Sequence, residues 1–158
     1  MNHFLTDEQK MIVDLARKIT LEEIIPQRAK LDEEEIFPSE ILRKVAEADL
    51  YGLYIPEQYG GYGGGVLDFC LAVEELSKGC IGVSVSFAAN ALGAYPILGF
   101  GTDEQKKKYL PKLAAGEWVG AYCLSEPSAG TDAASLAASA ADRGDHYLVN
   151  GTKAWVTN

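Results

Sequence analysis

The sequence is poor in the residues that build disulfide frameworks and metal sites. Its 158 residues include three cysteines and two histidines. Cys70, Cys80 and Cys123 are odd in number and form no C-x-x-C pair, so free thiols in a reducing compartment are expected rather than disulfides or zinc. His3 and His146 are isolated, so no metal site is expected on them. Neither histidine has the neighbourhood of a nucleophile–base pair, which leaves no basis for predicting a hydrolase.

Positive charge is also scarce, with 14 Lys and Arg against 23 Asp and Glu and a net charge of −9. A nucleic-acid binder is not expected, because neutralising phosphates requires a basic face. The basic cluster Lys106–Lys108 is interpreted as the solvated face of a helix. The acidic run Asp32–Glu35 is interpreted as a loop between helices. No basic start followed by an apolar run is present, so no secretory signal is predicted.

One segment, Ile81–Phe100, lacks charge altogether and is long enough to cross a bilayer. Glycine, serine, asparagine and proline dilute its hydrophobicity, and basic and aromatic anchors are missing at both ends. We therefore interpret it as a helix buried inside a soluble protein. A membrane span is the less favoured alternative.

Five helices are predicted in the first part of the chain. Thr6–Gln9 and Thr102–Gln105 have the pattern of capping boxes, in which a threonine and a glutamine exchange hydrogen bonds at a helix start. Pro26 limits the first helix, and Gly79 lies near the C-cap of the third. The glycine-rich stretch Gly60–Gly65 fits no phosphate-binding motif and is interpreted as a turn or mobile connector. The five helices are expected to begin near Thr6, Ser39, Val66, Ile81 and Thr102.

After Gly116 the pattern becomes typical of strands. The apolar run Trp118–Leu124 predicts a strand, and Leu136–Ala141 is a weaker candidate. Tyr147–Val149 and Lys153–Thr157 flank Asn150-Gly151, a dipeptide that tolerates the positive φ angles of a type I′ turn. This pattern predicts a β-hairpin.

The predicted fold is a mainly α-helical N-terminal domain, residues 1–116, followed by the first strands of a β domain, residues 117–158. The sequence ends at Asn158, in the second arm of the predicted hairpin. A small sheet that stops there leaves its edges unpaired, so we expect these residues to be a fragment of a longer protein.

The stretch Tyr122–Asp132 is the candidate ligand-binding segment. An apolar run leads into a turn made of serine, proline, glycine and other small residues. Such a turn exposes backbone N–H groups and hydroxyls together, which suits an anion or the edge of a heteroaromatic ring. Physical reasoning alone favours an ordinary turn over a binding site.

Four motifs together reverse that preference. Leu124–Asp132 resembles the L-[ST]-E-P-x-[AN]-G-[ST]-D signature of acyl-CoA dehydrogenases. Three other stretches resemble the family's P-E-x-Y-G-G, F-G-T-x-x-Q-K-x-x-Y-L-P and N-G-x-K-x-W-I-T-N motifs, in the same order and at similar spacing. They are Pro56–Gly61, Phe100–Pro111 and Asn150–Asn158. Ser128 stands where the family often has glycine and requires a backbone angle open to other residues. Thr131 stands where the family usually has serine and keeps the hydroxyl.

The resemblance implies a helical N-terminal domain, a central β domain and a C-terminal helical bundle, truncated here before the bundle, with FAD bound between the β domain and the bundle. It implies that Ser125 hydrogen-bonds the flavin, that Trp155 packs on the ring system and that Thr157 places its hydroxyl near N5. Trp155 also fits the core of a hairpin. The expected FAD-binding residues are Tyr122, Leu124, Ser125, Gly130, Thr131, Trp155 and Thr157. The expected substrate-binding residues are Thr131, Ser84, Val85 and Ala88, the last three on one face of the apolar helix.

The implied reaction is α,β-dehydrogenation of an acyl-CoA thioester in fatty acid or amino acid catabolism, with the motifs most like those of short-chain members. The resemblance also implies an electron-transferring flavoprotein as partner, a homotetramer, and a cytoplasmic enzyme, or a mitochondrial one in a eukaryote. The family's base is a glutamate of the C-terminal bundle, and neither Glu117 nor Glu126 replaces it. We therefore expect these 158 residues alone to be inactive and to bind FAD weakly. The alternatives are a non-catalytic helical module and an oxidase-like flavoenzyme of the same fold.

Overall fold

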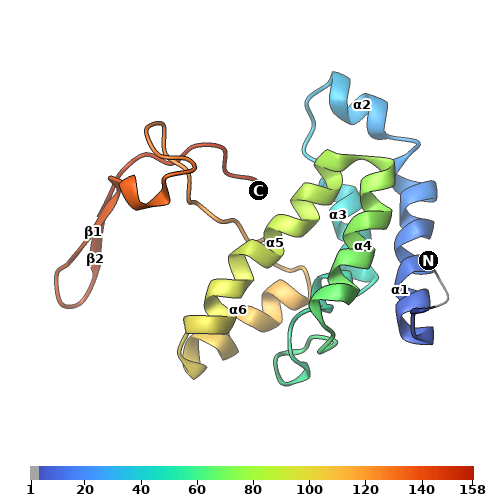
Figure 1. The fold of residues 1–158 in the computed structure, drawn as a ribbon, viewed down its shortest axis with the longest axis horizontal. Helices are drawn as coiled ribbons and strands as arrows, with labels where there is room; N and C mark the ends of the chain where they lie inside the picture. Colours follow the sequence, from blue (N-terminus) through green and yellow to red (C-terminus); the bar gives the residue numbers. More distant parts are fainter. Residues whose placement is uncertain (1–3) are drawn as a thin grey trace.

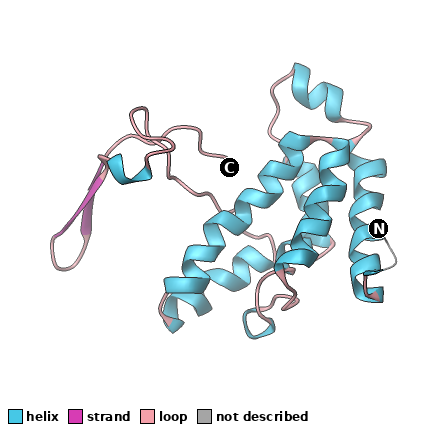
Figure 2. Cartoon of the chain, viewed as in Figure 1, coloured by secondary structure: helices cyan, strands magenta, loops and turns pink. Residues whose placement is uncertain are grey.

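A computed structural model describes residues 4–158 and shows a helical bundle from which the C-terminal part extends as an arm with a short hairpin (Figure 1). His3 lies outside the described residues. Figure 2 separates the helical part of the chain from the loop-rich arm. The predicted fold class, mainly helical with the start of a β part, is confirmed. The elements are α1 (Asp7–Ile19), α2 (Arg28–Glu33), α3 (Ser39–Glu47), α4 (Val66–Gly79), α5 (Ile81–Phe100), α6 (Asp103–Ala114), β1 (Ser139–Asp142) and β2 (Tyr147–Asn150).

Helices α1 and α6 begin at the predicted capping boxes. The Thr6 hydroxyl accepts a hydrogen bond from the Gln9 N–H (3.2 Å), and the Gln9 side chain accepts one from the Thr6 N–H (3.1 Å). Thr102 and Gln105 make the same exchange at α6 (3.2 and 2.9 Å). Each pair satisfies two N–H groups at a helix start, where intrahelical partners are missing.

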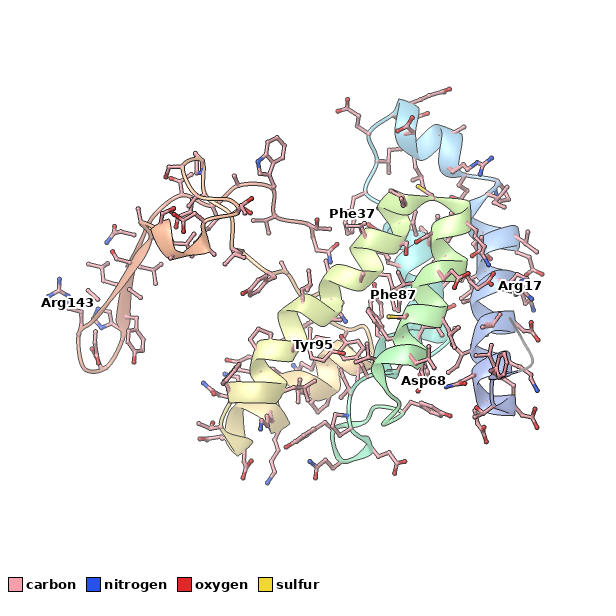
Figure 3. The ribbon with its side chains drawn as sticks, in the orientation of Figure 1. Arg17, Phe37, Asp68, Phe87, Tyr95 and Arg143 are labelled. Atoms are coloured by element: carbon pink, nitrogen blue, oxygen red, sulfur yellow. The ribbon has the colours of Figure 1, made fainter. Side chains whose placement is uncertain are left out.

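An aromatic cluster joins α5 to the rest of the bundle. Phe87 of α5 points into the bundle and is completely buried (Figure 3). Its ring lies 5.3 Å from that of Tyr51 and 5.2 Å from that of Phe69 of α4. Burial of a side chain of this size stabilises the fold by about 1.5–3 kcal/mol. One face of α5 is therefore firmly held, and its position relative to α4 is fixed.

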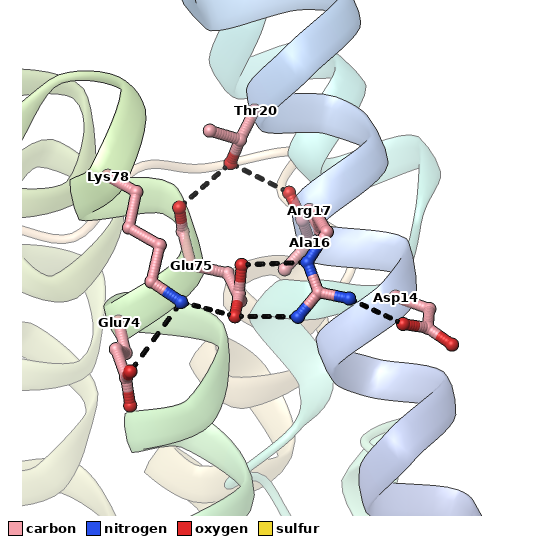
Figure 4. A network of polar contacts seen from close by, with 7 residues as sticks. All are labelled: Asp14, Ala16, Arg17, Thr20, Glu74, Glu75 and Lys78. Atoms are coloured by element: carbon pink, nitrogen blue, oxygen red, sulfur yellow. Dashed lines mark hydrogen bonds and ion pairs between the residues drawn. The ribbon is translucent and has the colours of Figure 1, made fainter. Parts of the chain in front are cut away.

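A polar network joins α1 to α4 (Figure 4). The buried Glu75 carboxylate accepts hydrogen bonds from two nitrogens of Arg17, Nε (3.3 Å) and Nη2 (3.1 Å), and from Lys78 Nζ (2.6 Å). The Thr20 hydroxyl lies 2.8 Å from the Ala16 carbonyl oxygen and 3.0 Å from that of Glu75. These contacts align the two helices side by side.

Gly79 lies at the end of α4 as predicted, but its role is close packing rather than a left-handed cap. A Cβ at this position would lie 2.8 Å from Cγ2 of Ile24 and 2.9 Å from Cγ2 of Thr20. Both residues belong to the π-helical turn Thr20–Ile24 that continues α1. The chain then turns at Pro26, in agreement with the predicted limit of the first helix.

One connection differs from the prediction and another agrees with it. The acidic run is partly helical, because α2 includes Asp32 and Glu33, and the helix ends before Glu35, whose φ is +51°. Its six residues carry too few apolar side chains to show a helical period. The glycine-rich stretch is a hydrogen-bonded turn, which confirms the first of the two predicted alternatives, and the Tyr62 N–H donates to the Gly52 carbonyl oxygen (2.8 Å).

Helix α5 has the predicted bounds but is buried on only one side. An 18-residue stretch of it has a mean hydropathy of 1.5, so by length and composition it could cross a membrane. Within the bundle, 44% of that stretch is buried. Phe87 and Asn90 face the core, whereas Val85 and Leu92 are exposed. The predicted burial holds for one face, and the other is open to a further contact.

The predicted hairpin is wrong in the segment that pairs with Tyr147–Val149, which is β1 and not Lys153–Thr157. β1 pairs with β2 in antiparallel fashion, with Ser139 opposite Asn150 and Asp142 opposite Tyr147. The turn is Arg143–His146, where the Gly144 N–H donates to the Asp142 carboxylate (2.7 Å). An aspartate that hydrogen-bonds the backbone two residues later is a turn signal of its own, and the sequence prediction overlooked it.

The two other predicted strand segments are not strands. In the described chain, neither Trp118–Leu124 nor Lys153–Thr157 joins a sheet. Both segments have a strand-like composition, but neither lies beside a described strand with which it could form a ladder of backbone hydrogen bonds. Gly151 directly follows β2, so it ends the hairpin instead of turning it. It packs closely against the residue before β1, where a Cβ would lie 2.5 Å from the Cβ of Ala138. The weaker candidate is partly confirmed by β1. The domain boundary at 116/117 stays a prediction.

Candidate functional site

A cavity of about 300 Å³ lies between α5 and the arm. Four of its lining residues belong to α5 and three to the arm. The α5 residues are spaced by three or four positions, which puts them on one side of the helix. The cavity therefore joins two expected substrate residues with three expected flavin residues. The lining residues are Val85, Ala88, Ala89, Leu92, Tyr122, Trp155 and Thr157.

The α5 wall of this cavity is apolar, which suits a hydrocarbon chain. Sequence reasoning named Val85 and Ala88 but missed Ala89 and Leu92, which the helical period would have added.

Ser84 is not part of this wall, although the sequence grouped it with its two neighbours. It is buried, its hydroxyl donates to the Val73 carbonyl oxygen (3.0 Å), and it accepts a hydrogen bond from Ser77 (2.9 Å). Ser84 thus faces α4, because one residue rotates a helix by about 100°. Its predicted role in binding substrate has no support from this geometry.

The arm is attached to α5 by two asparagine side chains. The Gly120 N–H donates to Asn90 Oδ1 (2.6 Å), and Asn90 Nδ2 donates to the Leu113 carbonyl oxygen (3.3 Å). Asn158 Nδ2 lies within hydrogen-bonding distance of the carbonyl oxygens of Ser86 (2.9 Å) and Gly120 (3.1 Å). Gly120 is therefore held through both its N–H and its carbonyl group. Sequence reasoning gave neither asparagine a role.

A buried carboxylate connects the segments of the arm. Glu126 accepts hydrogen bonds from the N–H groups of Ala137 (2.7 Å) and Ala138 (2.9 Å) and from Lys153 Nζ (2.9 Å). Hydrogen bonds from Ala137, Lys153 and Ala138 lower the pKa of Glu126 to about 2, so the group is ionised at neutral pH. Lys153 Nζ also donates to the Leu124 carbonyl oxygen (2.9 Å).

The motif turn and the C-terminal segment lie side by side. The Ala154 N–H donates to the Ser125 carbonyl oxygen (2.9 Å). Glu126 and Ala129 pair through both of their backbone groups and close the turn between them. Ser128, where the family often has glycine, lies in this turn without a positive φ, so a side chain fits there.

Trp155 is the most unusual residue of the arm. Its side chain is 94% exposed, and its φ is +59°, a region that bulky residues rarely adopt. Backbone strain of this kind clusters at ligand clamps and active sites.

The arm presents a donor set that fits a flavin. Trp155 and Tyr122 offer flat apolar surface, and the half-buried residues Ser125 and Thr157 carry hydroxyl groups in the same arm. A Cβ at Gly130 would meet no atom within 4 Å, so this backbone faces open space. Leu124, Ser125, Gly130 and Thr131 belong to the same arm but do not line the cavity.

Comparison with known proteins agrees with the family resemblance of the four motifs. The family model for the N-terminal domain of acyl-CoA dehydrogenases matches residues 6–117. The short-chain-specific acyl-CoA dehydrogenase of Clostridium acetobutylicum is 43% identical over 159 aligned residues, which cover 100% of this chain and 42% of the relative. The chain thus spans about two fifths of the length of the curated relatives it matches.

Solved structures agree. Butyryl-CoA dehydrogenase from Megasphaera elsdenii superposes with a TM-score of 0.92 at 37% identity, covering 99% of this chain and 42% of that one. An acyl-CoA dehydrogenase from Bacillus anthracis, solved in complex with FAD, gives a TM-score of 0.91 at 35% identity, covering 100% of this chain and 28% of that one.

Proposed function

Because the chain belongs to the acyl-CoA dehydrogenase family, we propose that the protein catalyses the FAD-dependent α,β-dehydrogenation of acyl-CoA thioesters with short acyl chains. The observation that carries the proposal is the cavity in which an apolar wall of α5 faces Tyr122, Trp155 and Thr157. A site of this reaction needs a dry, apolar surface for the acyl chain next to a surface for the flavin.

Each wall has its own task in the proposed reaction. Bound FAD supplies the acceptor for the β hydrogen, which leaves as hydride. Val85 and Ala88 orient the acyl chain and exclude water from it. Ser125 and Thr157 offer hydroxyls to the edge of the flavin, and Trp155 covers its ring system. Gly130 and Thr131 approach the pyrophosphate of FAD, and Thr131 also contacts the CoA part of the substrate.

The base that removes the α proton is proposed to lie outside these 158 residues. Glu126 is a poor base, because three hydrogen bonds hold its carboxylate and lower its pKa to about 2. Glu117 is exposed and does not line the cavity. The 158-residue chain alone is therefore expected to give no turnover and to bind FAD weakly, and turnover near that of a complete family enzyme would contradict this.

The remaining proposals concern the electron acceptor, the oligomeric state, the metabolic role and the location of the complete enzyme. The acceptor of the electrons is an electron-transferring flavoprotein, the complete enzyme is a homotetramer, and it acts in fatty acid or amino acid catabolism in the cytoplasm, or in the mitochondrial matrix of a eukaryote. Assaying the full-length protein for peroxide and for reduction of that flavoprotein separates a dehydrogenase from an oxidase.

The test of the reaction uses the full-length protein. We expect it to retain a yellow flavin after desalting, and butyryl-CoA to bleach the flavin absorbance under anaerobic conditions. The variant Trp155→Ala should retain less flavin, whereas Tyr147→Ala, which removes an exposed aromatic ring of β2 outside the cavity, should retain as much as the unchanged protein. The proposal would be refuted if the protein retained no flavin, or if no acyl-CoA reduced the flavin that it retained.

A further inference from the structure

Two asparagines form a clasp over one turn of α5, defined here as Asn90 and Asn158 with the Gly120 peptide between them. Asn90 accepts from the Gly120 N–H, and Asn158 lies within hydrogen-bonding distance of the Gly120 carbonyl oxygen. Asn158 also reaches the carbonyl oxygen of Ser86, one turn before Asn90. The clasp therefore ties two segments that are far apart in sequence, at Gly120 and at Asn158, to the same turn of α5.

The clasp lies next to the arm residues that line the cavity. Tyr122 follows Gly120 by two residues, and Thr157 directly precedes Asn158. Both Tyr122 and Thr157 face α5 across the cavity. Because so few bonds separate them from the clasp, their distance from the α5 wall depends on it.

Two glycines permit this close approach. A Cβ at Gly93 of α5 would lie 3.1 Å from the Gly120 Cα and 3.1 Å from the Ala121 nitrogen. A Cβ at Gly120 would lie 3.0 Å from Asn90 Oδ1. The two backbones are thus closely packed at this point, and an added methyl group would require one of them to shift by a few tenths of an ångström.

We propose that Asn90 and Asn158 are positioning residues that set the width of the cavity between α5 and the arm, and that this width makes the site favour straight over branched short acyl chains. The inference rests on the proposed function. Asn90 is completely buried, with its amide oxygen and nitrogen both hydrogen-bonded, so it holds Gly120 in one place. A slot of fixed width accepts a linear chain and excludes a branch, and one extra carbon in such a pocket changes specificity by about tenfold or more.

The experiment loosens the clasp in two independent ways in the full-length protein. Asn158→Asp keeps the shape but turns a donor into an acceptor that faces two carbonyl oxygens. Gly93→Ala drives a methyl group between α5 and the arm. The matched controls are Asn150→Asp, an exposed asparagine of β2, and Gly99→Ala, a glycine of α5 with no atom within 4 Å of an added Cβ.

The readout is kcat/KM for isobutyryl-CoA divided by that for butyryl-CoA, measured at saturating FAD, together with the dissociation constant of FAD. Both clasp variants should raise the ratio by roughly threefold to tenfold and weaken FAD binding, and both controls should leave the two quantities unchanged. A general loss of stability would lower both activities together and leave their ratio constant. Because two unrelated substitutions are used, one that fails to fold leaves the other to decide.

An unchanged ratio and unchanged FAD binding in the folded clasp variants would overturn the inference while the proposed function stands. If the unchanged protein oxidises neither substrate, the proposed function fails. The FAD dissociation constants still test the clasp in that case, because flavin binding needs no turnover, and equal values in all variants would then overturn the inference.

Discussion

Glu75 and Glu126 are both almost completely buried, yet both are held as anions. Burial alone raises the pKa of Glu75, but hydrogen bonds from Lys78 and Arg17 outweigh it and bring the pKa below its ordinary value. At Glu126 the N–H group of Ala137 is the largest cause of a lowered pKa. A buried carboxylate is strongly destabilising once its partners are removed, so these two residues make the bundle and the arm sensitive to single substitutions.

Arg17→Ala is the first test at this scale. The change leaves Glu75 buried with Lys78 as its remaining cation, and we expect the free energy of unfolding to fall by about 1–2 kcal/mol, less than for a fully buried pair because Arg17 is partly exposed. Arg43→Ala removes exposed ion pairs with Glu40 and Glu47 and should cost at most about 0.5 kcal/mol. Urea unfolding followed by circular dichroism measures both, and equal losses would contradict the role given to Glu75.

Glu126→Gln tests the arm through pH. The folded pKa of about 2 lies below the ordinary value of 4.5, so the charge stabilises the arm fully above about pH 4.5, and this contribution is lost as the pH falls toward 2. We expect the amides of Ala137 and Ala138 to exchange with deuterium faster in the variant at pH 7, and the difference from the unchanged protein to shrink below pH 4.5. Glu117→Gln is the control, and a pH-independent difference would refute the explanation.

At the scale of elements, local signals were predictable and pairing was not. The capping boxes of α1 and α6 and the length of α5 depend on residues within a few positions of one another, and all three predictions are confirmed. The strand at Trp118–Leu124 and the partner of Tyr147–Val149 depend on which segment lies alongside, and both predictions are wrong. Asn-Gly competed with the aspartate-stabilised turn Arg143–His146, which directly precedes β2, and composition alone does not decide between two plausible turns.

Two glycines at helix ends give opposite predictions for the same substitution. Alanine is a better helix former than glycine by about 1 kcal/mol, so Gly99→Ala, in open space at the end of α5, should stabilise the protein by up to that amount. Gly79→Ala at the end of α4 should instead lower the free energy of unfolding by about 1–3 kcal/mol, because the methyl group overlaps Ile24 and Thr20. Opposite shifts of the urea midpoint are expected, and a gain in both variants would show that α1 and α4 can separate at little cost.

In the whole molecule, the site is assembled from residues that no single stretch of sequence contains. The family resemblance named Val85, Ala88, Tyr122, Trp155 and Thr157, and these five line one cavity. Of the residues that hold them in place, Asn90 lies outside the four motifs, whereas Glu126 and Asn158 lie within two of them. Their supporting roles were not predictable, since a buried asparagine or glutamate looks like a surface residue until its partners are known.

Bundle and arm should differ sharply in stability. All eight residues of β1 and β2 are exposed, and a two-stranded hairpin without a packed face is marginally stable in water. In the 158-residue chain we expect the amides of α1, α4 and α5 to be protected from hydrogen exchange by factors of thousands, and those of β1 and β2 by less than about tenfold. Equal protection in both parts would show that the hairpin gains stability from a contact outside its own two strands.

The contact between Asn158 and Ser86 spans 72 residues. A chain leaves the ribosome from its N-terminus at roughly 5–20 residues per second, and helical units that are already complete can fold before the rest has emerged. α1 to α6 can therefore pack while the arm is still being synthesised, and the cavity is the last part of this chain to close. Newly made bundles therefore expose the apolar α5 wall to solvent for the seconds in which the arm is synthesised.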